Sequence, residues 1–139
     1  TRSDIVFLGR DSKENDRSYP NLTQEDFSGV SEALYGRTEN HGSMGLGWAP
    51  RVSANAVSAF EAARHSVGQA GFAVFPRPAA GNGTVVPVVY INPPTGENVS
   101  AIGYDMYSET VRRQAMDASA ALRRPVASGK VHLVKSQRP

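Results

Sequence analysis

The segment "VVPVVYINPPTGENVSAIGYD", Val85 to Asp105, decides the fold class of this chain. Its first part, 85–91, is rich in β-branched and aromatic side chains and predicts a strand. The stretch 92–98 contains two prolines and a glycine and predicts a turn, and 99–105 predicts the returning strand. Because such a turn is too short for the crossover that parallel strands need, the two strands are expected to be antiparallel.

An amphipathic helix is predicted before this strand pair. Thr23 is a good N-cap residue, and Asp26, three positions later, makes a variant of the capping box. Phe27, Val30 and Leu34 follow at helical spacing. We therefore expect a helix of about three turns that buries these three apolar side chains.

Two further helices are predicted from the same apolar spacing. Ser53 is the expected N-cap of the first, which ends at the glycines 68 and 71, and Ser108 that of the second, which Pro125 closes. On the second helix, Arg113 and Asp117 are spaced to form an ion pair. The expected buried stripes are Ala56, Phe60, Ala63 and Val67 on the first helix and Val111, Ala115, Ala118 and Leu122 on the second.

Short strands are also predicted at 72–75 and 130–135, whereas residues 1–22 are polar and predict an irregular segment. Helices followed by an antiparallel meander, which one helix interrupts, indicate an α+β fold with helices packed on one face of the sheet. We expect two parts. Residues 1–50 form an N-terminal loop and helical segment, and residues 51–139 form the main domain.

Composition excludes several classes of protein. The chain has no cysteine, which excludes disulfide frameworks and cysteine-bound zinc sites. Its formal charge is +2, and its basic residues form only isolated pairs, so we predict no nucleic-acid partner. No apolar stretch reaches the roughly 18 residues that span a bilayer, and no signal peptide opens the chain.

No catalytic set is predicted. The three histidines, His41, His65 and His132, lack the spacing of a metal site, and Ser43 has no nucleophile motif around it. Asp105 stands where many α/β enzymes keep a catalytic carboxylate, but an aspartate at a helix start also accepts backbone N–H bonds. We interpret Asp105 as such a structural acceptor. The sole tryptophan, Trp48, is predicted to pack under a loop, with closure of a pocket as the alternative.

An ordered set of motifs runs through residues 23–135: "WAPR", a helix that carries Phe60-Glu61, "PVVY", "GYDMYSETVRRQA" and "PVASGKVHL". The residues at the defining positions are Trp48, Pro50, Arg51, Pro87, Val88, Tyr90, Tyr104, Asp105, Ser108, Arg112, Ala115, Pro125, Val126, Ser128 and Leu133. Their order and spacing resemble those of the CHASE domain, an extracellular sensory domain associated with histidine kinases and nucleotide cyclases.

The resemblance implies a PAS-like fold, which is then expected for 51–139. It implies an extracytoplasmic, non-enzymatic sensor without a cofactor or metal, whose small-molecule ligand lies between the sheet and the helical layer. A histidine kinase or diguanylate cyclase domain would read the signal. Flanking segments, absent here, would provide the membrane attachment and a homodimer contact. The family's long leading helix and closing strand are also missing, so we expect a domain truncated at both ends.

The ligand-binding residues are predicted from strand alternation. Alternation places Thr84, Val86, Val88 and Tyr90 on one strand face, with Val85, Val89 and Ile91 on the other. The polar ends of the first set favour it as the pocket wall, completed by Ala101 and Tyr104 from the returning strand. Cytokinin receptors of the family hold adenine with an aspartate near the position of Thr84, so we expect a different ligand. The alternative function is a ligand-free interaction or dimerisation domain.

Overall fold

The computed structural model describes residues 6–7, 22–35 and 45–132, and expectations for His41, Ser43 and residues 133–135 lie outside these ranges. The α+β class is confirmed, whereas the PAS-like arrangement and the 1–50/51–139 division stay predictions. The elements are β1 Val6–Phe7, α1 Gln24–Tyr35, β2 Leu46–Trp48, β3 Val52–Ser53, the 3-10 turn η2 Ala54–Ala56, α2 Val57–Ser66, β4 Thr84–Val85, β5 Tyr90–Asn92, α3 Glu97–Ser100, the 3-10 turn η3 Met106–Ser108, α4 Thr110–Leu122 and β6 Val126–Ala127.

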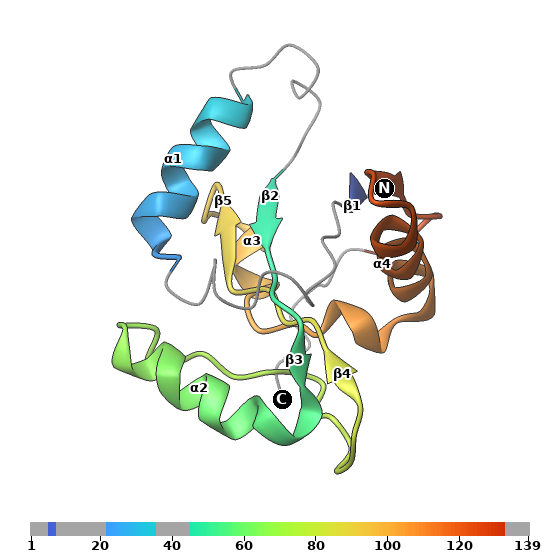
Figure 1. The fold of residues 1–139 in the computed structure, drawn as a ribbon. Helices are drawn as coiled ribbons and strands as arrows, with labels where there is room; N and C mark the ends of the chain where they lie inside the picture. Colours follow the sequence, from blue (N-terminus) through green and yellow to red (C-terminus); the bar gives the residue numbers. More distant parts are fainter. Residues whose placement is uncertain (1–5, 8–21, 36–44, 133–139) are drawn as a thin grey trace.

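The described strands form three antiparallel pairs, β1 with β6, β2 with β5, and β3 with β4. Trp48 lies opposite Tyr90 in the second pair, and Val52 lies opposite Val85 in the third. Helices α1 and α2 lie on one side of these strands and α4 lies on the other (Figure 1). The sequence predicted helices on one face only.

Residues 86–89, which we call the central segment, connect β4 to β5. The backbone N–H of Val88 donates to the Tyr104 carbonyl at 3.0 Å, and the N–H of Gly103 donates back to the Val88 carbonyl at 2.7 Å. Residues 103–105 also bond to Phe75. The Phe75 N–H donates to the Gly103 carbonyl, and the Asp105 N–H donates to the Phe75 carbonyl. The predicted antiparallel return of 99–105 is therefore correct only at its end, because residues 97–100 form α3.

The predicted strand 85–91 is divided into β4 and β5. Pro87 has no N–H to donate, and the Val86 N–H donates to the Asp105 side chain instead of a backbone carbonyl. The alternation of faces fails as a result. Val85, Val89 and Tyr90 all belong to one apolar cluster, whereas Val86 belongs to another.

Two apolar clusters form the core on the two sides of the central segment. The larger combines Phe27 of α1 and Val57 of α2 with strand residues such as Val89. The smaller combines Val86 with Ala115 and Met116 of α4. The larger cluster contains residues of α1 and α2, and the smaller contains residues of α4. The central segment 86–89 contributes to both clusters.

The capping box of α1 is confirmed. The Asp26 N–H donates to Thr23 Oγ1 at 3.1 Å, and the Thr23 N–H donates to the Asp26 carboxylate at 3.2 Å. Phe27 is buried as predicted, but Val30 is 56% exposed because the helix instead turns Ser31 inward, one turn from Phe27. The predicted face of α1 is therefore only partly correct.

The predicted buried faces of α2 and α4 are displaced. In α2 the buried residues are Val57, Glu61 and Arg64, whereas Ala56, Ala63 and Val67 of the predicted stripe are exposed. In α4 they are Arg112, Ala115, Met116 and Ser119, and Leu122 of the predicted stripe is exposed. The cause is the same in both helices, because charged side chains that find internal partners occupy the core-facing positions.

The predicted caps and outer strands also differ. Ser53 makes no side-chain capping bond, and Glu109 rather than Ser108 caps α4. Of the predicted strand 72–75, only Phe75 makes a bridge, with Tyr104. β1 lies within the segment predicted to be irregular, and its partner β6 precedes the predicted strand 130–135.

Candidate functional site

The six predicted ligand-binding residues lie in different environments. Val86, Val88 and Tyr90 are buried, and Thr84, Ala101 and Tyr104 are half-buried. Val88 and Tyr104 are joined through their backbones, but Tyr90 and Val86 belong to different clusters. Their ligand-binding role stays a prediction, and the structure does not bring all six to one described pocket.

Tyr90 lies at the centre of an aromatic stack. Its ring packs between Phe27 and Trp48, with centroid distances of 5.7 Å to each. Its hydroxyl donates to the Leu22 carbonyl at 2.7 Å and accepts from Arg64 Nη1 at 3.0 Å. Trp48 therefore packs half-buried against the larger apolar cluster with Tyr90 as its partner, and it does so from strand β2 rather than under a loop as predicted.

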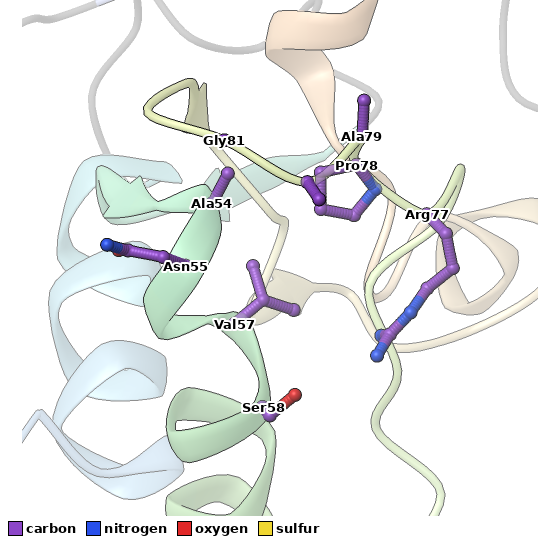
Figure 2. Close-up of a pocket in the computed structure, with 9 residues that line it drawn as sticks. Ala54, Asn55, Val57, Ser58, Arg77, Pro78, Ala79 and Gly81 are labelled. Atoms are coloured by element: carbon purple, nitrogen blue, oxygen red, sulfur yellow. The ribbon is translucent and has the colours of Figure 1, made fainter.

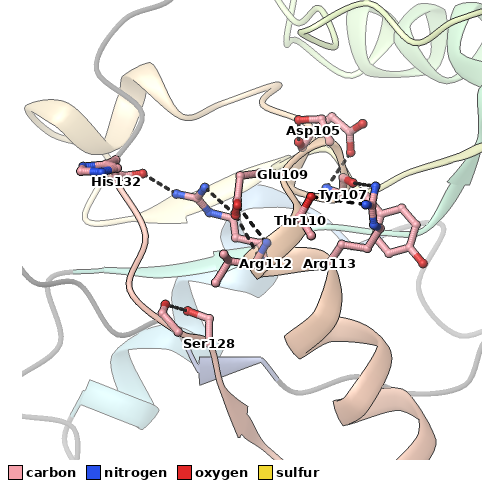
Figure 3. Close-up of polar contacts among 11 residues, drawn as sticks. Asp105, Tyr107, Glu109, Thr110, Arg112, Arg113, Ser128 and His132 are labelled. Atoms are coloured by element: carbon pink, nitrogen blue, oxygen red, sulfur yellow. Dashed lines mark hydrogen bonds and ion pairs between the residues drawn. The ribbon is translucent and has the colours of Figure 1, made fainter.

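Asp105 joins the central segment to the start of α4 (Figure 3). One carboxylate oxygen accepts from the Val86 N–H at 2.8 Å and from the Tyr107 N–H at 2.9 Å. Burial raises the pKa of Asp105, and these two hydrogen bonds only partly oppose that rise. The interpretation of Asp105 as a structural acceptor at this junction is confirmed.

The first turn of α4 holds a buried arginine. The Glu109 carboxylate accepts from the N–H groups of Val111 and Arg112, and it lies 3.4 Å from Arg112 Nη1. Arg112 Nη2 donates to the His132 carbonyl at 2.6 Å (Figure 3). The Arg112 guanidinium also lies over the Tyr104 ring. Burial would raise the pKa of Glu109, but its hydrogen bonds and Arg112 lower it.

An exposed cluster surrounds Tyr107. Its hydroxyl donates to Asp117 at 2.6 Å, and this bond, together with burial, raises the pKa of Tyr107. Arg51 and Arg113 each place a guanidinium over the Tyr107 ring, at 5.2 and 5.8 Å. Asp117 pairs with Arg51, so the predicted pairing of Arg113 with Asp117 is wrong.

The buried face of α2 carries two charges that sequence reasoning missed. Glu61 accepts from the Val74 N–H at 3.0 Å and from Arg77 Nη1 at 2.8 Å. Burial would raise the pKa of Glu61, but the hydrogen bonds from Arg77 and Val74 lower it below its ordinary value. This carboxylate holds the segment at 72–77 against α2 in place of a strand partner.

Arg64 is 7% exposed, and its guanidinium lies over the rings of Phe60 and Tyr90 at 5.7 and 6.0 Å. Tyr90 is its hydrogen-bond acceptor. Its Nε is buried without a partner, and so is Oε1 of Gln69, which follows the end of α2. No carboxylate among the described residues pairs with Arg64.

A pocket of about 280 Å³ lies where α2 begins (Figure 2). Its walls are residues 54–58, apart from Ala56, and the loop 77–81, and Figure 2 shows Val57 and Ser58 across from Pro78 and Arg77. The pocket is open to solvent and contains none of the six predicted binding residues. Asn55, Ser58 and Arg77 are its polar side chains.

The described ranges contain no group of three side chains suited to hold a metal ion. His65 lies at the exposed end of α2 with Nε2 2.8 Å from the Phe72 carbonyl, and His132 is exposed. None of the described helices is long and apolar enough to cross a membrane. Among the described residues, the polar contacts given above join helices to strands and loops, and none of them joins a nucleophilic side chain to a base.

Comparison with protein families gives a single assignment. The CHASE domain model matches residues 20–139, which is most of the chain. The chain belongs to the CHASE domain family. A search of curated proteins finds no match. The predicted resemblance is therefore confirmed, and its motifs now have structural roles.

CHASE domains are extracellular sensory domains of signalling receptors, and they are not catalytic. In this CHASE domain, Trp48 and Tyr90 stack, Asp105 holds the start of α4, and Arg112 binds the backbone of His132. Glu61 belongs to the helix with Phe60-Glu61 on which the resemblance rests, whereas Arg64 lies outside the motifs quoted for the family. The burial of both has one sequence signal: Glu61 is four residues and Arg64 seven residues after the apolar Val57, the spacing of one helix face.

Proposed function

We propose that this CHASE domain binds a small molecule and transmits a conformational change to a membrane-bound receptor of the histidine kinase or diguanylate cyclase type. The domain would lie outside the cytoplasm, with attachment and homodimer contacts provided by flanking segments. The ligand would contact the six predicted residues Thr84, Val86, Val88, Tyr90, Ala101 and Tyr104.

The position of the central segment between the two apolar clusters supports this proposal. Residues 86–89 contribute to both apolar clusters and bond to 103–106, which lead directly into α4. Asp105 accepts bonds from both parts. A ligand that displaces this segment would move α4 relative to α1 and α2, and a ligand shifts a receptor only through unequal affinity for two such arrangements.

A thermal-shift screen of amino acids, nucleobases, organic acids and other metabolites tests the proposal. A ligand that binds only the folded domain stabilises it by about 2.7 kcal/mol at a hundredfold excess over Kd, which corresponds to several degrees. Val88→Ala and Tyr90→Phe are expected to weaken the response. Val67→Ala changes an exposed valine and serves as the control.

The second candidate is a ligand-free interaction or dimerisation domain. It is favoured by the burial of Val86, Val88 and Tyr90 by protein side chains, and by large apolar side chains that remain exposed. These are Val30, Val67, Val99 and Leu122. A screen without a response, combined with concentration-dependent dimerisation that Leu122→Ser or Val67→Ser abolishes, would replace the sensor proposal with this one.

A further inference from the structure

The guanidinium of Arg64 has one unoccupied edge. Nη1 donates to the Tyr90 hydroxyl, whereas neither Nε nor Nη2 donates to any residue that the structure describes. In arginine, the N–H groups of Nε and Nη2 point in the same direction and form a fork. That fork matches the two oxygens of a carboxylate, which it binds through two parallel hydrogen bonds.

The surroundings of Arg64 do not neutralise its charge. On the same face of α2, Glu61 is engaged by Arg77 and by the Val74 N–H. Among the residues that the structure describes, the groups that contact the guanidinium are the rings of Phe60 and Tyr90 and the Tyr90 hydroxyl, all of them uncharged. Burying a cation without an anion is unfavourable, and native proteins rarely do so without a partner.

From these contacts we infer that Arg64 binds the carboxylate of the sensed ligand. The ligand class is a small organic carboxylate, which pairs with the Nε–Nη2 edge while its apolar part lies beside the half-buried Phe60 ring. Gln69 adds a second buried atom without a partner, the acceptor Oε1, which suits a donor group on the same molecule. This inference rests on the proposed sensor function and names the chemistry of its ligand.

Benzoate is the probe, because it joins a carboxylate to a flat apolar ring, and benzamide is its neutral control of the same shape. The melting temperature of the purified chain is measured against increasing concentrations of each, and calorimetric titration gives the affinity. Benzoate is expected to raise the melting temperature in a concentration-dependent manner, and benzamide to bind at least about tenfold more weakly, because two charge-assisted hydrogen bonds are lost.

Two variants assign the binding to Arg64. Arg64→Met keeps the length of the side chain and removes the charge, and it is expected to abolish the benzoate response. Arg64→Lys keeps the charge but not the fork, and it is expected to weaken benzoate at least about tenfold. Arg51→Lys, on an exposed arginine beside Tyr107, is the matched control and is expected to bind benzoate as the unmodified chain does.

A benzoate response that is equal in Arg64→Met, or equal for benzamide, would overturn the assignment, and so would the absence of any benzoate response. If Arg64→Met does not fold, Arg64→Lys decides the question alone. Neutral metabolites in the same assay separate this inference from the sensor proposal. A neutral ligand whose binding survives Arg64→Met would leave the sensor in place and remove the carboxylate, whereas a screen with no binding at all would remove both.

Discussion

The α2 and α4 sides of the domain each bury an arginine, and they treat its charge differently. Arg112 in α4 has the Glu109 carboxylate, the His132 carbonyl and the Tyr104 ring as partners. Arg64 in α2 has the Tyr90 hydroxyl and two rings, without a carboxylate among the described residues. On the α4 side the arginine thus has a carboxylate partner within the protein, whereas on the α2 side our inference assigns that role to the carboxylate of a ligand.

The largest effect is expected at Gly103, whose N–H donates to Val88 of the central segment that both sides share. Gly103 has φ +89°, and a Cβ atom there would lie 2.1 Å from the Ala73 carbonyl oxygen. Gly103→Ala should destabilise the domain by at least about 3 kcal/mol, because both the backbone conformation and the close contact oppose it. Thermal or denaturant unfolding measures this loss.

Gly96→Ala is the matched control. Gly96 also has a positive φ, +57°, but no atom lies within 4 Å of the added Cβ. Its loss should be smaller than that of Gly103→Ala, about 1–3 kcal/mol, because only the backbone conformation (φ +57°, ψ −133°) opposes the added Cβ. Equal losses in the two variants would show that the close approach to Ala73 contributes nothing.

The next effect tests the comparison directly. Arg112→Met should destabilise the domain by about 3 kcal/mol, because it leaves the His132 carbonyl and part of the Glu109 carboxylate without a donor. Arg64→Met without ligand should cost less than about 1 kcal/mol or increase stability, because it removes a buried charge that no carboxylate balances. If unfolding of the two variants shows equal losses, the two arginines do not differ in the way we describe.

Asp105→Ala should cost about 2 kcal/mol, because it leaves the buried Val86 N–H and the Tyr107 N–H without their acceptor. Asp105→Asn keeps an acceptor and should restore most of this loss at neutral pH. The folded pKa of Asp105 is raised, so its contribution to stability is fully present below the ordinary value of 3.8 and is lost as the pH rises through the folded pKa. The free energy of unfolding, measured from about pH 3 to about pH 7, should therefore fall less with rising pH in Asp105→Asn than in the unmodified domain.

Glu61→Gln should have a small effect, about 1 kcal/mol at neutral pH, because Arg77 is largely exposed and the Val74 N–H keeps an acceptor. The folded pKa of Glu61 is lowered, so its contribution is present above the ordinary value of 4.5 and is lost as the pH falls through the folded pKa. Acid unfolding of the variant should be less steep over that range. Glu97→Gln, on an exposed glutamate of α3, is the matched control for removal of one carboxylate.

Local signals predicted several features correctly. Thr23 and Asp26 form the capping box, and the short connection after 85–91 does return the chain antiparallel, at 103–105. Asp105 accepts the backbone bonds expected of it. Each of these depends on neighbours in the sequence or on backbone geometry, which a pattern of residue types can express.

The candidate site could be predicted only in part. Val86, Val88 and Tyr90 are buried as wall residues would be, but Pro87 and the side chain of Asp105 break the alternation on which the set was based. Arg64 escaped prediction because a charged residue on a helix is ordinarily exposed. Its contact with Tyr90, 26 positions away, is absent from any local pattern.

By itself, the sequence determined the α+β class, the family and the antiparallel return, because these follow from residue periodicity, turn residues and ordered motifs. Only the tertiary structure decided which faces of α2 and α4 are buried. Periodicity ranks positions by apolar character, but burial of a charge depends on whether a distant group can pair with it. Val74 and Arg77 do so for Glu61, and His132 does so for Arg112, whereas the Nε of the buried Arg64 has no partner among the described residues.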